Sequence, residues 1–131
     1  MPSSETYERP AIAGSGTIAC GLAACASVAS RTALLARSDA SAWKAEEQAH
    51  ALCAKVDGAD PKRVKVTTEP GDLADCDVVI EAVIEELEPK VELLKTIGDA
   101  AADADLATTT SSLSLDELAA DSGHPERLFG L

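Results

Sequence analysis

The sequence has few aromatic and few basic residues. Its 131 residues include one Trp, one Tyr and one Phe, although 46% of the residues are hydrophobic. The core must therefore consist of Ala, Val, Leu and Ile, which suit tightly packed helices and parallel strands. Lys and Arg number 11 against 23 Asp and Glu, giving a net charge of −12. This charge argues against a nucleic-acid partner, because such partners are held by basic residues that neutralise phosphates.

Long apolar runs and paired cysteines are also missing. No stretch approaches the ~20 apolar residues that a membrane-spanning helix needs, and residues 1–10 lack the apolar segment of a signal peptide. The cysteines form no C-x-x-C pair and have no His at zinc-binding spacing, which argues against a metal site. We therefore expect a cytoplasmic protein without a membrane or metal partner, in which the cysteines are buried and reduced. The four cysteines are Cys20, Cys25, Cys53 and Cys76.

Short apolar runs alternate with longer segments of helical periodicity along the whole chain. Strands are predicted over residues 10–13, 32–36, 64–67, 77–83, 106–110 and 128–131. Helices are predicted over residues 17–30, 41–56, from 88 onward and 115–121, with Ser41 and Ser114 as caps. Strands joined by helical crossovers form a parallel sheet with helices on both faces. The pattern thus predicts one doubly wound, Rossmann-type α/β domain over residues 1–131, whose ligand binds at the carboxyl ends of the strands.

The segment between the first strand and the first helix matches the dinucleotide-binding motif G-x-G-x-x-[GA]. In this motif Gly14 makes the tight turn, Gly16 admits the pyrophosphate, and Ala19 packs the helix on the strand. Unpaired N–H groups at the positive end of the helix would hold the phosphates in this otherwise acidic protein. The cofactor-binding residues predicted from the motif are Gly14, Ser15, Gly16, Thr17 and Ile18.

The end of the second predicted strand bears on the choice between NAD and NADP. NAD-specific domains place an Asp or Glu there, on the ribose hydroxyls. This sequence has Arg37 and Ser38, which can hold the 2′-phosphate of NADP through charge-assisted hydrogen bonds of ~1.5–3 kcal/mol each. We predict NAD or NADP as the cofactor, with Arg37 favouring NADP. In the alternative, Arg37 is a solvated surface residue and Asp39 binds the ribose of NAD.

Three further segments carry a resemblance to a known family. They are DVVIEAVIEEL over residues 77–87, ATTTSSLS over residues 107–114 and PERLFGL over residues 125–131. With the glycine motif, they make nearly the whole chain resemble the N-terminal NAD-binding domain of the 3-hydroxyacyl-CoA dehydrogenases. The resemblance implies an oxidoreductase that interconverts a 3-hydroxyacyl-CoA and a 3-oxoacyl-CoA by hydride transfer.

The resemblance also implies roles for individual residues. Ser111 falls on the family serine that touches both the cofactor and the substrate oxygen, so it is the catalytic residue expected in this chain. Glu85 and Lys90 fall where the family contacts the nicotinamide half of the cofactor. In the alternative, Glu85 is a helix-start carboxylate, Lys90 is solvated and Ser111 has a capping or turn role. The other cofactor contacts implied are Ala82, Val83 and Thr109.

The sequence departs from the family pattern in three places. Thr109 stands where the family usually has Asn, and only about 27 residues separate Arg37 from Val64, where the family usually inserts a longer helical hairpin that helps clamp CoA. In the family, the catalytic His follows directly after the segment that FGL over residues 129–131 resembles, so this chain stops before it. His50 and His124 are expected to be exposed residues elsewhere.

We therefore expect this chain alone to bind the cofactor and to turn over little. An acyl-CoA substrate and a homodimer are expected only with the C-terminal helical domain, which is absent from the sequence. Two alternatives are a non-catalytic nucleotide-binding module and a dehydrogenase of the same superfamily that acts on a small hydroxy acid.

Overall fold

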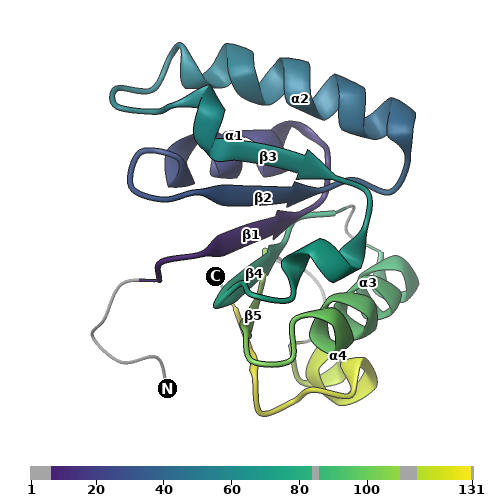
Figure 1. The fold of residues 1–131 in the computed structure, drawn as a ribbon. Helices are drawn as coiled ribbons and strands as arrows, with labels where there is room; N and C mark the ends of the chain where they lie inside the picture. Colours follow the sequence, from purple (N-terminus) through teal and green to yellow (C-terminus); the bar gives the residue numbers. More distant parts are fainter. Residues whose placement is uncertain (1–6, 84–85, 110–114, 131) are drawn as a thin grey trace.

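The computed structural model describes residues 7–83, 86–109 and 115–130, and six strands in them form one parallel sheet (Figure 1). The strands are β1 (Pro10–Ala13), β2 (Thr32–Leu35), β3 (Val64–Thr67), β4 (Val78–Glu81), β5 (Asp105–Thr108) and β6 (Leu128–Gly130). Their order across the sheet is β3-β2-β1-β4-β5-β6. In this order the sheet grows from β1 toward one edge, then from β4 toward the other. The predicted Rossmann-type α/β fold is confirmed.

Helices cover both faces of this sheet. They are α1 (Thr17–Ala26), α2 (Asp39–Cys53), α3 (Leu87–Ala100) and α4 (Leu115–Ser122), with short 3-10 helices η1 (Pro61–Arg63) and η2 (Pro70–Leu73). In Figure 1, α1 and α2 lie on one side of the sheet, and α3 and α4 lie on the other. No helix among the described residues is long and apolar enough to cross a membrane.

Each face of the sheet has its own core. Because alternate residues of a strand face opposite sides, Ala11 and Ala13 of β1 belong to the core beneath α3 and α4, and Ile12 belongs to the other. The first core also holds the larger side chains Leu94, Ile97, Leu106 and Leu118. The second consists mainly of small side chains from α1 and α2, namely Ala19, Cys20, Ala23, Ala24, Ala45 and Ala49. These small residues let α1 lie close to the sheet, as its composition predicts.

The helix α2 is capped by Ser38, and the predicted cap at Ser41 is wrong. Ser38 has an extended backbone (φ −149°, ψ 161°), and its Oγ accepts a hydrogen bond of 3.1 Å from the Ser41 N–H. Both serines are suitable caps, but Ser41 lies within the first turn that begins at Asp39. The Ser38 hydroxyl therefore satisfies an otherwise unpaired N–H of the helix start.

Two helices end earlier than their periodicity predicts. Helix α1 stops at Ala26, because Ser27 Oγ donates to the Ala24 carbonyl oxygen at 2.7 Å and Arg63 donates to the carbonyl oxygens of Ser27 and Val28. These side chains satisfy the carbonyl groups that a longer helix would have paired internally. Helix α2 likewise ends at Cys53, before the predicted end at residue 56.

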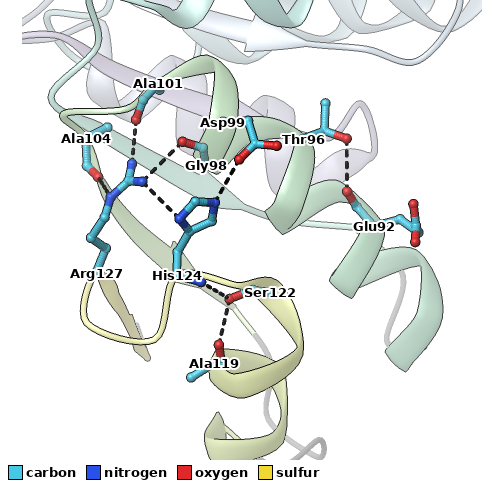
Figure 2. Close-up of polar contacts among 10 residues, drawn as sticks. All are labelled: Glu92, Thr96, Gly98, Asp99, Ala101, Ala104, Ala119, Ser122, His124 and Arg127. Atoms are coloured by element: carbon cyan, nitrogen blue, oxygen red, sulfur yellow. Dashed lines mark hydrogen bonds and ion pairs between the residues drawn. The ribbon is translucent and has the colours of Figure 1, made fainter.

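His124 is half-buried, so its predicted exposure is wrong. Figure 2 shows the ring between the end of α3 and the turn after α4, with Nε2 at 3.1 Å from Asp99 Oδ1 and Nδ1 at 3.3 Å from Arg127 Nη1. The ring lies so close to α3 that a Cβ on Gly98 would be 2.3 Å from His124 Cδ2. Gly98 and Asp99, from a distant part of the sequence, thus cover a residue that local sequence places in an exposed turn.

Arg127 closes the carboxyl end of α3 in the same region. Its guanidinium donates hydrogen bonds to three backbone carbonyl oxygens, those of Gly98, Ala101 and Ala104 (Figure 2). A cation at this position also opposes the negative end of the helix dipole. The turn before β6 is therefore fixed to the end of α3.

The cysteines and the other histidine follow the prediction in part. Cys20, Cys53 and Cys76 are buried free thiols, whereas Cys25 is exposed on α1. Burial was predicted for all of them, and Cys25 differs because it lies outside the buried stripe of α1. His50 is exposed on α2, as predicted.

Candidate functional site

The predicted site residues follow the carboxyl ends of neighbouring strands. Gly14 and Ser15 follow β1, Arg37 lies just beyond β2, Ala82 follows β4 and Thr109 follows β5. The chain leaves β1 for one face of the sheet and β4 for the other, so the carboxyl ends of these two strands are the topological switch point. The structure therefore gathers these residues at one edge. Glu85 and Ser111 lie outside the described residues.

Gly14 has a conformation and a neighbour that only glycine permits. Its φ is +142°, and its N–H donates to the Leu35 carbonyl oxygen at 2.9 Å. A Cβ at this position would lie 2.4 Å from the Ala82 carbonyl oxygen. Ala82 is itself held by a 2.9 Å hydrogen bond from its N–H to the Ala13 carbonyl oxygen. The turn after β1 is thus packed directly on the backbone after β4.

Gly16 has a different role at the start of α1. It is the N-cap, with φ −81° and ψ −174°, and no side chain accepts hydrogen bonds from the first N–H groups of the helix. A Cβ on Gly16 would have no neighbour within 4 Å, so the space in front of the helix is open. The first turn contains no acidic residue. This arrangement leaves N–H groups and the positive end of the helix dipole available to a phosphate.

The other residues of the glycine motif connect the turn with its surroundings. Thr17 is exposed and its Oγ1 accepts a 3.1 Å hydrogen bond from Gln48 Nε2 of α2. Ile18 is 69% exposed, an unusual position for a large apolar side chain in the first turn of a helix. The Ser15 carbonyl oxygen accepts a hydrogen bond from the Cys20 thiol. Burial raises the pKa of the Cys20 thiol, which keeps it in the protonated form that can donate.

The end of β2 presents two charged residues to solvent. Arg37 and Asp39 are both exposed, and the backbone before them is fixed by a 2.8 Å hydrogen bond from the Ala36 N–H to the Thr67 carbonyl oxygen. Ser38 Oγ donates to Ser41 Oγ at 2.9 Å while it caps α2. The cap therefore already uses the Ser38 hydroxyl, and Arg37 is the predicted NADP-binding residue whose charge faces solvent.

Lys90 is buried, so the alternative that it is a solvated lysine is wrong. Its side chain is 1% exposed, and its Nζ lies 2.6 Å from Oε2 of Glu81, whose side chain is 0% exposed. Lys90 Nζ also donates to the Val83 carbonyl oxygen at 3.3 Å. The ion pair joins the first turns of α3 to the end of β4, which explains how a charged side chain can be buried.

The family model for the 3-hydroxyacyl-CoA dehydrogenase NAD-binding domain matches residues 10–131. The chain belongs to this family. The glycine turn, the switch point and the open start of α1 are therefore features of a 3-hydroxyacyl-CoA dehydrogenase NAD-binding domain.

Curated relatives carry enzyme names of the same class. The chain is 35% identical over 133 residues to the 3-hydroxyadipyl-CoA dehydrogenase of Escherichia coli (strain K12), covering 92% of this chain and 28% of that protein. It is 39% identical over 70 residues to the probable 3-hydroxybutyryl-CoA dehydrogenase of Deinococcus radiodurans, covering 53% of this chain and 25% of that protein. The chain thus aligns with about a quarter of the length of these relatives.

A solved structure of the family has the same fold. The (S)-3-hydroxybutyryl-CoA dehydrogenase PaaH1 from Ralstonia eutropha matches with a TM-score of 0.83 and 31% identity. The match covers 95% of this chain and 48% of that one. The described domain therefore corresponds to about half of the crystallised dehydrogenase.

Sequence reasoning missed Glu81 and Thr108 of this NAD-binding domain. Both were placed in predicted strands without a role, yet their buried side chains lie together at the carboxyl ends of β4 and β5. A signal was available, because a carboxylate within a run of buried β-branched residues needs a partner. Lys90, nine positions after Glu81, is that partner.

Proposed function

We propose that this chain is the NAD(P)-binding domain of an oxidoreductase that interconverts a 3-hydroxyacyl-CoA and a 3-oxoacyl-CoA by hydride transfer. The glycine turn at the switch point carries this proposal. Gly14 packs on the Ala82 backbone, and Gly16 leaves open the space in front of α1. The matched family and the CoA thioesters in the names of its relatives support the reaction class.

The proposed cofactor lies across the ends of β1 and β4. Ser15, Gly16, Thr17 and Ile18 line the pyrophosphate region at the start of α1, and Gly14 keeps the turn close to β4. On the nicotinamide side the contacts are Ala82, Val83, Glu85, Lys90, Thr109 and Ser111. A nicotinamide cofactor, when bound, would supply hydride-transfer chemistry, and Ser111 would hydrogen-bond the reacting oxygen of the substrate.

We further propose that Arg37 favours NADP over NAD. Its exposed guanidinium follows β2, where the ribose of the adenosine half is expected in this fold. One or two charge-assisted hydrogen bonds to a 2′-phosphate, at ~1.5–3 kcal/mol each, would favour NADP by about tenfold or more. Asp39, also exposed, is the residue that would bind NAD in the alternative.

The whole enzyme is proposed to be a cytoplasmic homodimer. Its C-terminal helical domain would supply the general base, the dimer contacts and much of the acyl-CoA site. In the hydride-transfer step the base would exchange the proton of the substrate oxygen.

Titration of the purified chain with NADH and NADPH tests the proposal. The single tryptophan, Trp43 of α2, is 64% exposed and provides a fluorescence signal, and calorimetry gives an independent affinity. Arg37→Asp should weaken NADPH binding about tenfold, and Arg31→Asp at the opposite end of β2 is the matched control. Absence of binding with either nucleotide would refute the proposed function. Unchanged NADPH affinity in Arg37→Asp would refute the NADP preference alone.

A second candidate is a dehydrogenase of the same superfamily that acts on a small hydroxy acid. The short connection between α2 and β3 favours it, because only turns and η1 lie between Cys53 and Val64. The connection therefore offers little structure to hold CoA. A panel of acyl-CoA and hydroxy-acid substrates, tested on the full-length enzyme, distinguishes the two.

A further inference from the structure

Glu81 occupies the last position of β4, next to the turn that receives the cofactor. Its side chain is fully buried on the face covered by α3, at 0% exposure. Its strand partners in register are Ala13 of β1 and Thr108 of β5. A carboxylate therefore lies inside the protein at the carboxyl edge of its central strand.

The hydrogen bonds of this carboxylate reach three different segments. Oε2 accepts from the Val83 N–H at 2.8 Å and from Lys90 Nζ at 2.6 Å, while Oε1 accepts from Thr108 Oγ1. Lys90 Nζ returns to the same turn by donating to the Val83 carbonyl oxygen. Both polar groups of the Val83 backbone are thus bound within the Glu81–Lys90 pair.

These three segments border the nicotinamide side of the proposed site. The turn at Val83 follows β4, Lys90 lies in the first turns of α3, and Thr108 immediately precedes Thr109. The Glu81 backbone is part of the same arrangement, since its carbonyl oxygen accepts from the Thr109 N–H at 3.1 Å. Glu81 is therefore the residue through which the turn, the helix and the end of β5 are fixed relative to one another.

A buried ion pair of this kind contributes position more clearly than stability. Removing two charges from water costs about as much as their attraction returns, so an apolar pair of similar size is often equally stable or more stable. Directional hydrogen bonds, however, set the place of each partner more narrowly than apolar packing does. We infer that Glu81 is a positioning residue that holds Val83, Lys90 and Thr109 in place for the nicotinamide half of the cofactor. This inference rests on the proposed function.

The double variant Glu81→Gln/Lys90→Met tests it by removing both charges together. Glu81→Gln alone would leave the Lys90 ammonium buried beside a neutral amide, so it would confuse a loss of stability with a loss of position. The matched control is Glu92→Gln/Lys95→Met, which makes the same changes at two exposed positions of α3. Affinities are measured for NADH and for ADP-ribose, which has the adenosine and pyrophosphate but lacks nicotinamide. Thermal unfolding of each variant is recorded in parallel.

The double variant should bind NADH about tenfold more weakly than the control. A loss of this size is expected when one or two charge-assisted hydrogen bonds no longer hold the nicotinamide side of the site in place. Its affinity for ADP-ribose should stay within about twofold of the control, because the glycine turn and α1 are unchanged. NADH affinity equal to that of the control would overturn the inference. So would equal weakening of NADH and ADP-ribose, which would indicate a general structural effect.

Thr108→Val is the test that leaves Lys90, itself a proposed nicotinamide contact, unchanged, and it also serves should the double variant fail to fold. It keeps the shape of the side chain and removes the hydroxyl that donates to Glu81 Oε1. The same selective weakening of NADH is expected, and equal NADH affinity in Thr108→Val and wild type would overturn the role of Glu81. A wild-type chain that binds neither NADH nor ADP-ribose would refute the proposed function itself. Wild-type binding with no selective change in the variants would refute only the positioning role.

Discussion

Replacing Gly14 with Ala should destabilise the folded chain severely. A non-glycine residue at φ +142° is strained by about 1–3 kcal/mol. The new Cβ would also lie 2.4 Å from the Ala82 carbonyl oxygen, closer than atoms can approach. Overpacking of this kind adds about 1–3 kcal/mol. The Ala82 backbone cannot simply move away, because it is hydrogen-bonded to Ala13 in the central strand pair.

The two contributions together are about 2–6 kcal/mol, a large part of the ~5–15 kcal/mol by which domains are usually stable. Gly16→Ala is the matched comparison. Its φ of −81° is ordinary for any residue, and its Cβ would have no neighbour within 4 Å. Only the weaker N-cap preference of Ala remains, at about 1 kcal/mol or less. Gly16→Ala should therefore fold normally and bind NADH at least about tenfold more weakly, because its methyl group would enter the proposed pyrophosphate space.

Urea denaturation followed by circular dichroism measures the first effect, and NADH titration measures the second. A Gly14→Ala variant within about 1 kcal/mol of wild type would refute the reasoning from strain and contact. A Gly16→Ala variant that binds NADH like wild type would refute the placement of the pyrophosphate. A Gly16→Ala variant less stable than Gly14→Ala would also refute the reasoning from strain and contact.

Three further predictions concern other parts of the molecule. Burial, followed by the hydrogen bond to Asp105, raises the pKa of Tyr7 from 10.0 to about 12. Absorbance titration of this single tyrosine should therefore show a midpoint near 12, and the midpoint should be lower in Asp105→Asn. An equal midpoint in the denatured protein would contradict this prediction. Because the folded pKa is the higher one, the stability contributed by Tyr7 should be complete below pH 10.0 and lost as the pH rises toward about 12. A thiol reagent should modify exposed Cys25 rapidly and the three buried cysteines slowly. The single fast phase should therefore disappear in Cys25→Ser, and its persistence would contradict the exposure of Cys25. Arg127→Ala should cost about 1–3 kcal/mol in urea denaturation, because it leaves carbonyl groups at the end of α3 unpaired; a loss no greater than that of exposed Arg31→Ala would contradict the capping role.

The sequence predicted the sheet and the glycine turn because both depend on local patterns. Alternating apolar runs and helical periodicity give the order of elements, and Gly14 and Gly16 are determined by their own turn. The cap of α2 was misplaced because Ser38 and Ser41 have equal capping chemistry, and the backbone around them decides between the two.

Local patterns indicate that Glu81 needs a partner, but they do not identify Lys90 as that partner or show that His124 is partly buried. Glu81 and Lys90 meet only when α3 packs on β4, and His124 is partly buried because the fold brings Asp99 of α3 beside it. Burial of a charged or titratable side chain depends on these tertiary contacts, whereas local sequence shows only its polarity. The exposure of Cys25 has the same origin, because a moderately apolar residue can lie on either side of a helix made largely of small residues.

The pairing of β1 with β4 joins two halves of the sheet that are consecutive in the chain. Residues 10–67 supply β3, β2 and β1, and residues 78–130 supply β4, β5 and β6. Among the described strands, the ladder between these halves has only four residue pairs, Pro10 with Val78 through Ala13 with Glu81. At one end of this seam the Asp77 carboxylate accepts from the N–H groups of Glu8 and Arg9.

At the other end of the seam, Gly14 rests on Ala82. A dinucleotide spanning that end would contact both halves at once, so its binding energy would act directly against their separation. The amides of β1 and β4 should then gain more protection from hydrogen exchange than those of the outer strands. Because only a short ladder joins the two halves, binding of the ligand should directly stabilise the sheet.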